Sequence, residues 1–336
     1  MTTLHTMHVT PDPGPDQALV TAEVEATVAT ALAEMAAQAR DYAQQAKSAN
    51  TRRAYRSDWA DFAGWCQAHS LVALPAAPAT VALYLTSAAE RLKAATLTRR
   101  LTAISQAHQA AEHPSPTKSA TVRAVASGIR RAKGTAQQGK AAAVTDEMRA
   151  MVAVLPPTLV GRRDRALLLL GFAGAFRRSE LVALDVADVQ QTRDGLVVTL
   201  RKSKTDQEGA GRRVGIPYGG HPQSCPVRAL EDWLAAAGIA TGPLFRGLRN
   251  DGALMGRLSD KGVARVVQRR AQAVGLDPAR YGGHSLRAGL ATAAAAAGKS
   301  ERAIMAQTGH KSVPMVRKYI RSGELFTDNA AAGLGL

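Results

Sequence analysis

The sequence is poor in cysteine and has no long apolar run, which narrows the kinds of protein it can form. Its two cysteines, Cys66 and Cys225, stand far apart, and neither lies near a second cysteine or a group of histidines. This spacing argues against a disulfide framework and a zinc site, and it favours a reducing, cytoplasmic setting. No apolar run reaches the roughly 18 residues that a membrane-spanning helix needs. The first 17 residues also lack the basic start and apolar segment of a signal peptide.

Aromatic residues make up only 4% of the chain, whereas 46% of it is apolar and alanine is abundant. Because alanine is the best helix former, this composition predicts a mainly helical protein. A length of 336 residues favours two domains, each able to bury a core, at roughly 150 residues per domain.

Acidic residues are outnumbered, with 27 Asp and Glu against 43 Lys and Arg, a formal charge of +16 and a pI of about 10.4. Residues 1–40 contain five acids and one base, a net charge of −4, so the other 296 residues carry +20. Residues 47–140 alone contain 14 bases and four acids, a net charge of +10. This distribution predicts a polyanionic partner, with nucleic acid as the first candidate. The alternative is a solvated basic surface that has no partner.

Composition also divides the chain into segments. The polar, proline-containing start predicts disorder, and the run KGTAQQGKAAA predicts a linker because it has no large apolar residue. The expected segments are a disordered tail (1–17), a helical extension (18–47), an all-helical domain (48–132), a linker (133–143), a second domain (144–321) and a C-terminal tail (322–336).

Periodicity predicts a mainly α fold with a small antiparallel sheet in the second domain. Tyr55, Trp59, Phe62 and Cys66 recur at helical spacing, after a cap at Asn50 or Thr51. Further helices are expected at about 79–91, 95–112, 117–132, 161–173, 226–236, 261–273, 285–297, 300–308 and 312–319. Strands are expected at 195–205 and 212–217, with a short third strand at 186–189.

Four clusters in the second domain combine residues that suit phosphate chemistry. They are Arg177 with Glu180 in AFRRSEL, Lys204 in the turn between two strands, His284 with Arg287 in GGHSLR, and His310 followed by Tyr319. Each cluster alone has an ordinary explanation, such as a helix cap, a surface arginine or a core tyrosine. Their joint presence, in this order, predicts a reaction at a phosphate group.

A phosphodiester reaction needs this combination of side chains. Two guanidinium groups grip the non-bridging oxygens and stabilise the charge that develops on phosphorus. A tyrosine hydroxyl, with an ordinary pKa of about 10, needs a nearby base or positive charge before it attacks. The departing oxygen needs an acid, which a lysine can supply. The sequence has neither the carboxylate pattern of a two-metal site nor a nucleotide-binding glycine loop, so we expect no cofactor and no metal.

The set resembles the tyrosine recombinase (phage integrase) family over about residues 48–336. The resemblance implies a helical core-binding domain and a catalytic domain with the DNA breaking-rejoining enzyme fold, which together clamp the DNA. It implies that Arg177, Arg287, His284 and His310 act on the phosphate. Glu180 would support Arg177, Lys204 would protonate the 5′-oxygen and Tyr319 would be the nucleophile. Competing assignments are Arg178 for Arg177, Lys202 for Lys204 and Tyr281 for Tyr319.

The expected partner is double-stranded DNA with inverted-repeat half-sites. Candidate contacts in the first domain are Arg52, Arg53, Arg56, Arg99 and Arg100, and on the helix 261–273 they are Arg265, Gln268, Arg269 and Gln272. Arginine and glutamine read guanine and adenine edges, although phosphate contact or plain solvation is an equal alternative for each residue.

The resemblance further implies a homo-tetramer that exchanges strands through a Holliday junction, with subunit contacts made by the C-terminal tail. Accessory proteins are compatible with this interpretation. Alternatives are a type IB topoisomerase, a DNA-binding protein that has lost catalysis, and a basic interaction protein. A covalent DNA adduct would exclude the last two, and a tetramer on DNA would exclude the topoisomerase.

Overall fold

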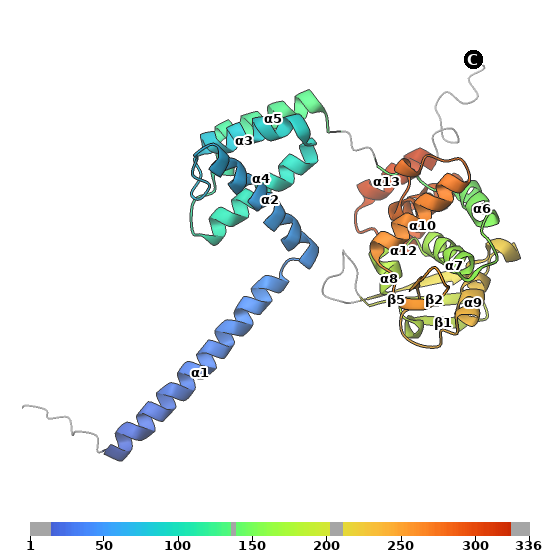
Figure 1. Ribbon diagram of the computed structural model, residues 1–336, viewed down its shortest axis with the longest axis horizontal. Helices are drawn as coiled ribbons and strands as arrows, with labels where there is room; N and C mark the ends of the chain where they lie inside the picture. Colours follow the sequence, from blue (N-terminus) through green and yellow to red (C-terminus); the bar gives the residue numbers. More distant parts are fainter. Residues whose placement is uncertain (1–14, 136–138, 202–210, 324–336) are drawn as a thin grey trace, which may run out of the picture. The chain divides into compact units, whose positions relative to one another are not determined.

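The computed structural model describes residues 15–135, 139–201 and 211–323 of the chain. The chain divides into two compact units, residues 1–137 and 138–336, each of which is described below by itself (Figure 1). The division falls inside the range expected for the linker. No helix in the described part of the chain is long and apolar enough to cross a membrane.

All the regular elements among the described residues of the first unit are helices. They are α1 (Pro15–Gln45), α2 (Ala49–Ala68), α3 (Pro78–Arg91), α4 (Ala94–Ala110), the 3-10 helix η1 (Pro116–Lys118) and α5 (Ala120–Lys133). The cap of α2 is Ser48, whose hydroxyl accepts a hydrogen bond from the Thr51 N–H at 3.2 Å, so the predicted cap at Asn50 or Thr51 is wrong. Phe62, Cys66 and Leu85 are fully buried in the core of this unit.

The second unit is mostly helical, and its described residues form two small antiparallel sheets. Its helices are α6 (Thr145–Ala153), α7 (Leu159–Ala173), α8 (Arg178–Ala183), α9 (Pro226–Ala237), α10 (Asp260–Ala273), α11 (Gly283–Ala296), α12 (Glu301–Thr308) and α13 (Val313–Gly323), with 3-10 turns η2 (Val186–Asp188), η3 (Pro222–Ser224) and η4 (Pro278–Arg280). The strands are β1 (Val189–Thr192), β2 (Gly195–Leu200), β3 (Arg212–Pro217), β4 (Arg246–Leu248) and β5 (Leu254–Arg257). The fold class expected from the sequence is confirmed.

The larger sheet has the order β1-β2-β3, with Val198 opposite Val214. Alternate residues of β2 and β3 enter the core because successive side chains of a strand point to opposite faces. The strand predicted at 186–189 is wrong in its position. Residues 186–188 form η2, held by a hydrogen bond from the Asp185 N–H to the Asp188 carboxylate at 2.9 Å, and β1 begins at Val189.

The segment just before α6 packs on the second unit. The Ala141 N–H donates to the Arg280 carbonyl at 2.7 Å, and the Ala143 N–H donates to the Ser285 carbonyl at 3.0 Å. Gly289 of α11 permits this approach, because a Cβ there would lie 1.9 Å from the Ala143 carbonyl oxygen. The last residues of the predicted linker are therefore part of the second unit.

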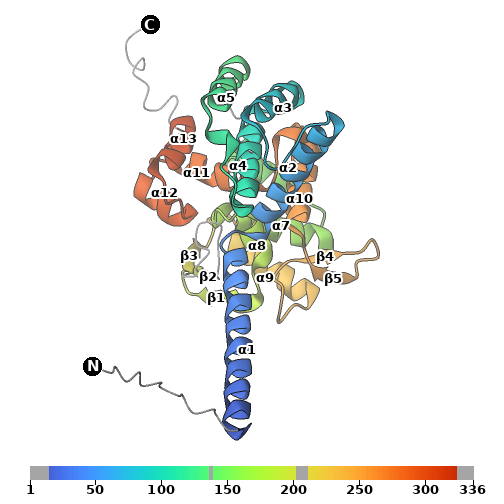
Figure 2. The ribbon, with the colours of Figure 1, turned by 90° about the vertical axis from the view of Figure 1, so that its left-hand side faces the viewer.

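Helices α11, α12 and α13 lie together at one end of the second unit (Figure 2). A small apolar cluster joins them, formed by Ala291, Ala295, Ile304 and Val316 with Tyr319 packed against it. This cluster fixes α13 on α11, so α13 presents Tyr319 toward the first turn of α11.

Candidate active site

Arg177 stands at a sharp turn between α7 and α8. Two residues earlier, Ala175 adopts a φ of +48°, a left-handed conformation that residues other than glycine seldom take. Buried Glu180 holds the arginine twice, since its carboxylate accepts from the Arg177 N–H at 2.9 Å and from Nη1 at 2.5 Å. Arg178 instead faces outward and pairs with Asp260 at 3.2 Å. The geometry therefore favours Arg177 over Arg178 as the inward-facing arginine.

Arg287 of α11 is almost fully buried, with 1% of its surface exposed. Its Nη1 donates to the Ala175 carbonyl at 2.9 Å, whereas its buried Nη2 has no hydrogen-bond partner among the described residues. Burial and the nearby charge of Arg177 lower the pKa of Arg287 to about 10. The group stays charged at neutral pH, so the site contains a buried cationic donor that is free to take a ligand.

Tyr319 and His284 meet directly. The Tyr319 hydroxyl lies 2.8 Å from Nε2 of His284, which is in the first turn of α11. Burial lowers the pKa of His284, and the charges of Arg287 and Arg177 lower it further. Burial raises the pKa of Tyr319, while Arg287 acts in the opposite direction. At neutral pH a neutral imidazole therefore faces a neutral phenol, and the imidazole can accept the phenol proton.

His310 lies beside this pair, with its ring centroid 5.8 Å from that of Tyr319. The Thr308 hydroxyl donates to the Ile304 carbonyl at 2.7 Å, so it accepts a hydrogen bond from Nδ1 of His310 at 2.7 Å. Burial and the charges of Arg287 and Arg177 lower the pKa of His310 to about 4. The structure thus gathers Arg177, His284, Arg287, His310 and Tyr319, all of which the sequence singled out.

The competing tyrosine occupies a different environment. Tyr281 is 5% exposed, and its hydroxyl donates to the Glu147 carboxylate at 2.8 Å. Burial and Glu147 raise the pKa of Tyr281 to about 12. These contacts favour Tyr319 as the reactive tyrosine.

Lys204 and its competitor Lys202 lie outside the described residues, as do residues 324–336 of the predicted tail. The strands on either side are described, and Leu200 of β2 pairs with Arg212 of β3 at the end of the hairpin. Within the described ranges, no group of three or more His, Cys, Asp or Glu could hold a metal ion.

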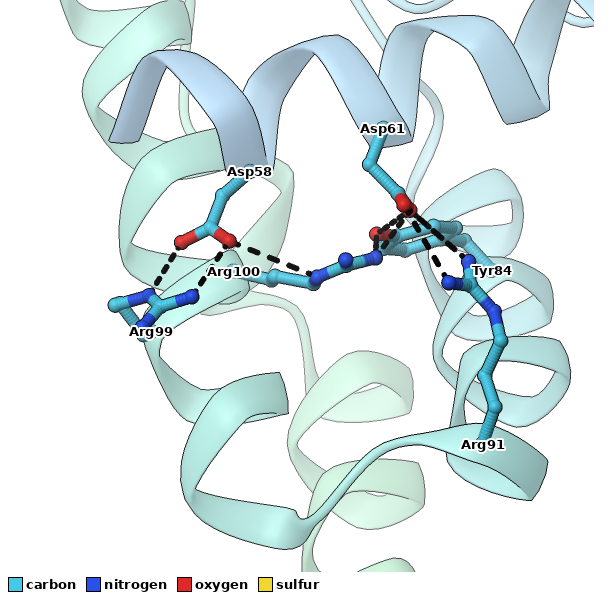
Figure 3. Close-up of polar contacts among 6 residues, drawn as sticks. All are labelled: Asp58, Asp61, Tyr84, Arg91, Arg99 and Arg100. Atoms are coloured by element: carbon cyan, nitrogen blue, oxygen red, sulfur yellow. Dashed lines mark hydrogen bonds and ion pairs between the residues drawn. The ribbon is translucent and has the colours of Figure 1, made fainter. Parts of the chain in front are cut away.

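Arg99 and Arg100, expected as DNA contacts, are bound to carboxylates of their own domain (Figure 3). Arg99 is half exposed and pairs with buried Asp58 at 2.6 Å. Arg100 is only 7% exposed and contacts Asp58, Asp61 and the Tyr84 hydroxyl. The prediction that Arg100 contacts DNA is therefore wrong, because its guanidinium is used inside the helical domain.

The other expected contacts lie at the surface. Arg52, Arg53 and Arg56 are exposed near the start of α2. Valines 263, 266 and 267 of α10 are buried, and the four expected base-reading residues of this helix, Arg265, Gln268, Arg269 and Gln272, line one recess of about 880 Å³. Arg249 and Asn250, from the turn between β4 and β5, also line this recess.

Sequence patterns did not reveal the residues that hold the expected site residues in place. The Ala175 carbonyl and the Thr308 hydroxyl have this role for Arg287 and His310. Arg212 of β3 binds the end of α12 just before His310. Thr308 could have been noticed from its place in TGH, but no sequence signal marks a backbone carbonyl or an arginine at the start of a strand.

Comparisons with known proteins show the family to which the chain belongs. Residues 144–324 match the model of the phage integrase family. The integrase/recombinase xerD homolog of Selenomonas ruminantium is 44% identical over 292 residues, covering 85% of this chain and 86% of the relative. Recombinase cre of Escherichia phage P1 is 25% identical over 302 residues, covering 83% of this chain and 86% of the relative.

Solved structures show the same fold at low identity. An XerH site-specific recombinase in a post-cleavage complex with palindromic difH substrate has a TM-score of 0.57 and 18% identity, covering 74% of this chain and 70% of its own. A lambda integrase (75-356) dimer bound to a COC' core site has a TM-score of 0.56 and 20% identity, covering 86% of this chain and 94% of its own. The family match and the extent of the relatives establish that the chain belongs to the phage integrase family and is a tyrosine recombinase, an enzyme that transfers DNA strands in site-specific recombination.

Proposed function

We propose that this recombinase cleaves DNA by attack of the Tyr319 hydroxyl on a backbone phosphate. The observation that carries the proposal is the 2.8 Å contact between this hydroxyl and His284 Nε2, beside Arg287, whose Nη2 is buried without a partner among the described residues. Leaving a buried donor unpaired costs roughly 1–3 kcal/mol, so a phosphate oxygen would be a favourable partner.

In the proposed step, a bond forms between the tyrosine oxygen and phosphorus while the bond from phosphorus to the 5′-oxygen breaks. The phenol proton passes to His284, and the 5′-oxygen takes a proton from Lys204. Arg177 and Arg287 stabilise the charge on the non-bridging oxygens, with Glu180 holding Arg177 in position. The resulting 3′-phosphotyrosyl ester retains the energy of the broken bond, so the step requires neither a metal ion nor a nucleotide.

Rejoining is the reverse reaction with a 5′-hydroxyl from a second DNA strand. Exchange between two sites in this way passes through a Holliday junction, and we propose that four copies of the chain act together on two sites. The DNA-bound structures of XerH and lambda integrase support double-stranded DNA as the partner, and the XerH substrate is palindromic. Inverted half-sites and subunit contacts through the C-terminal tail (322–336) are parts of this proposal.

The basic surfaces of both units would hold the duplex. In the first unit these are Arg52, Arg53, Arg56 and the outer edge of Arg99, and in the second unit they are the four polar residues of the α10 recess. The two buried thiols, Cys66 and Cys225, support a reducing cytoplasm as the place of action.

The test is covalent trapping. Full-length protein is mixed with DNA fragments from around its own gene, each nicked near the presumed crossover so that rejoining fails, in buffer containing a chelator. We expect a protein–DNA adduct on a denaturing gel with the wild type and with the control Tyr281→Phe, and none with Tyr319→Phe. An adduct that persists in Tyr319→Phe would overturn the assignment of the nucleophile.

A further inference from the structure

We propose that Arg212 of β3 is a positioning residue, which holds the end of α12 and thereby the segment from His310 to Tyr319 in the arrangement needed for strand cleavage. This role deepens the proposed function and rests on it for the activity test.

Arg212 caps the C-terminal end of α12. Its Nη1 donates to the carbonyls of Ala306 at 3.2 Å and Gln307 at 3.0 Å, and its Nη2 donates to the Thr308 carbonyl at 3.4 Å. Carbonyls of the last helical turn have no partner within their helix, and the negative end of the helix dipole favours a cation. One side chain therefore satisfies three successive carbonyls of this turn.

The turn that follows is shaped around the same guanidinium. Gly309 has a φ of +66°, and its N–H donates to the Met305 carbonyl at 2.7 Å. A Cβ at this position would lie 2.8 Å from Cζ and Nε of Arg212, so a larger residue would displace the arginine. Glycine is thus required at this position for two reasons, the positive φ and the closeness of Arg212. The next residue along the chain is His310.

A second side chain fastens the same helix end. Nε2 of Gln307 donates to the Ala173 carbonyl at 2.7 Å and to the Gly215 carbonyl at 3.1 Å. Ala173 is the last residue of α7, just before the turn that carries Arg177, and Gly215 belongs to β3. The end of α12 is therefore tied to the two elements that border the arginine side of the active site.

Any displacement of this helix end would reach both reactive rings. His310 is held by the Thr308 hydroxyl, and Tyr319 packs in the cluster that includes Ile304 of α12. Misplacing a reacting group by about 1 Å costs on the order of 10²-fold in rate. We therefore expect the loss of Arg212 to slow cleavage strongly, although Arg212 does not contact the DNA in this role.

A direct contact between Arg212 and a DNA phosphate is the competing role. The side chain is partly buried, and burial together with the charge of Arg177 lowers its pKa, while Glu180 acts in the opposite direction. The two roles differ in what they demand, since a phosphate contact needs charge whereas the helix cap needs the spread of N–H groups that only a guanidinium has.

The experiment measures the rate of adduct formation on the nicked substrate, and DNA affinity at several salt concentrations. The variants are Arg212→Ala, Arg212→Lys and the control Arg213→Ala, whose exposed side chain lies on the opposite face of the same strand. We expect Arg212→Ala to cleave about 10²-fold more slowly with unchanged DNA affinity and salt dependence. Arg212→Lys should restore little of the rate, and Arg213→Ala should cleave like the wild type.

Cleavage by Arg212→Ala at the wild-type rate would overturn the proposal. The proposal would also be overturned by a second pattern, in which Arg212→Lys recovers the cleavage rate and Arg212→Ala has a slope of log K against log salt that is shallower by about one. That pattern marks a phosphate contact.

Hydrogen exchange of the protein without DNA tests the same role independently of activity. In Arg212→Ala, amides of residues 304–320 should exchange faster, while those of α9 keep their protection. Unchanged exchange in 304–320, or equal loss across the whole second unit, would contradict the positioning role. If the wild type forms no adduct yet the local exchange result holds, the proposed function fails and the structural role of Arg212 stands.

Discussion

At the residue scale, the proposed cleavage step depends on the protonation states of His284 and Tyr319. Burial and two neighbouring arginines lower the pKa of His284 below its ordinary value of 6.5, and burial raises the pKa of Tyr319. The phenol therefore keeps its proton at neutral pH, and the imidazole is free to receive it. Acid should act mainly through His284, because protonation removes the acceptor.

The first prediction concerns this acid limb. The single-turnover rate of adduct formation should change little between pH 8 and pH 6.5 and should fall below pH 6.5, the ordinary pKa of histidine, by up to about tenfold per pH unit. DNA binding measured over the same range serves as the control. A cleavage rate that shows no decline at any pH below 6.5 at which DNA binding is intact would show that His284 is not the base.

The second prediction concerns Lys204. If this lysine protonates the 5′-oxygen, Lys204→Ala should slow cleavage by about 10²–10⁴-fold on ordinary DNA. A substrate with sulfur in place of the bridging 5′-oxygen has a leaving group that needs no proton, so it should restore the rate. The matched variant is Lys202→Ala, which should cleave ordinary DNA normally. If the sulfur-containing substrate restored the cleavage rate of Lys202→Ala and not that of Lys204→Ala, Lys202 and not Lys204 would be the proton donor.

At the scale of elements, a network of charged residues joins α2, α3 and α4 (Figure 3). Asp58 is 3% exposed and holds Arg99 and Arg100 of α4, while Asp61 contacts Arg100, Arg91 and Tyr84. Burial opposes ionisation of Asp61, but hydrogen bonds from Arg100 and Arg91 outweigh it and lower its pKa. The network fixes how α4 lies on α2.

The third prediction is that Asp58→Ala destabilises the first unit by about 3–5 kcal/mol, because it leaves the buried guanidinium of Arg100 with fewer partners. Native-state hydrogen exchange of amides in α2 and α4 would measure this change, with α9 as the internal reference. The control is Asp194→Ala, which removes an ion pair with Arg193 that is fully at the surface. It should cost at most about 1 kcal/mol, measured on the amides of the flanking strands β1 and β2. Equal effects of the two variants would contradict the structural role of Asp58.

The same elements show what a sequence can and cannot predict. That Arg177, His284 and Tyr319 lie together could be predicted, because they belong to short motifs whose order suits one phosphate reaction. Arg100 was misassigned because a basic residue on a helix was taken as exposed. Its spacing of three and four residues from Leu97 and Ile104 places it on the buried face.

Other elements left too little signal in the sequence. Strands β4 and β5 escaped prediction because Leu254 and Met255 are exposed and the alternating pattern of a half-buried strand is missing. The role of Arg212 depends on carbonyls about 95 residues away along the chain, which local patterns do not encode.

At the scale of the whole molecule, the charge of +16 governs how the protein meets DNA. Each phosphate contact releases counterions, so affinity should fall steeply as salt rises. The exposed arginines of α2 are a simple place to test this.

The fourth prediction is that Arg56→Ala lowers the salt dependence of DNA binding, measured as the slope of log K against log salt, by about one. Arg193→Ala is the control, because Arg193 is also exposed but belongs to the turn between β1 and β2. Equal slopes in the wild type and Arg56→Ala would remove Arg56 from the candidate contacts.

Identifying the bond between protein and DNA would test the nucleophile itself. The trapped adduct is digested with protease and nuclease, and mass spectrometry locates the remaining nucleotide on the peptides. We predict a nucleotide joined through its 3′-phosphate to Tyr319 and to no other residue. A nucleotide on Tyr281 or on another side chain, or a linkage through a 5′-phosphate, would contradict it.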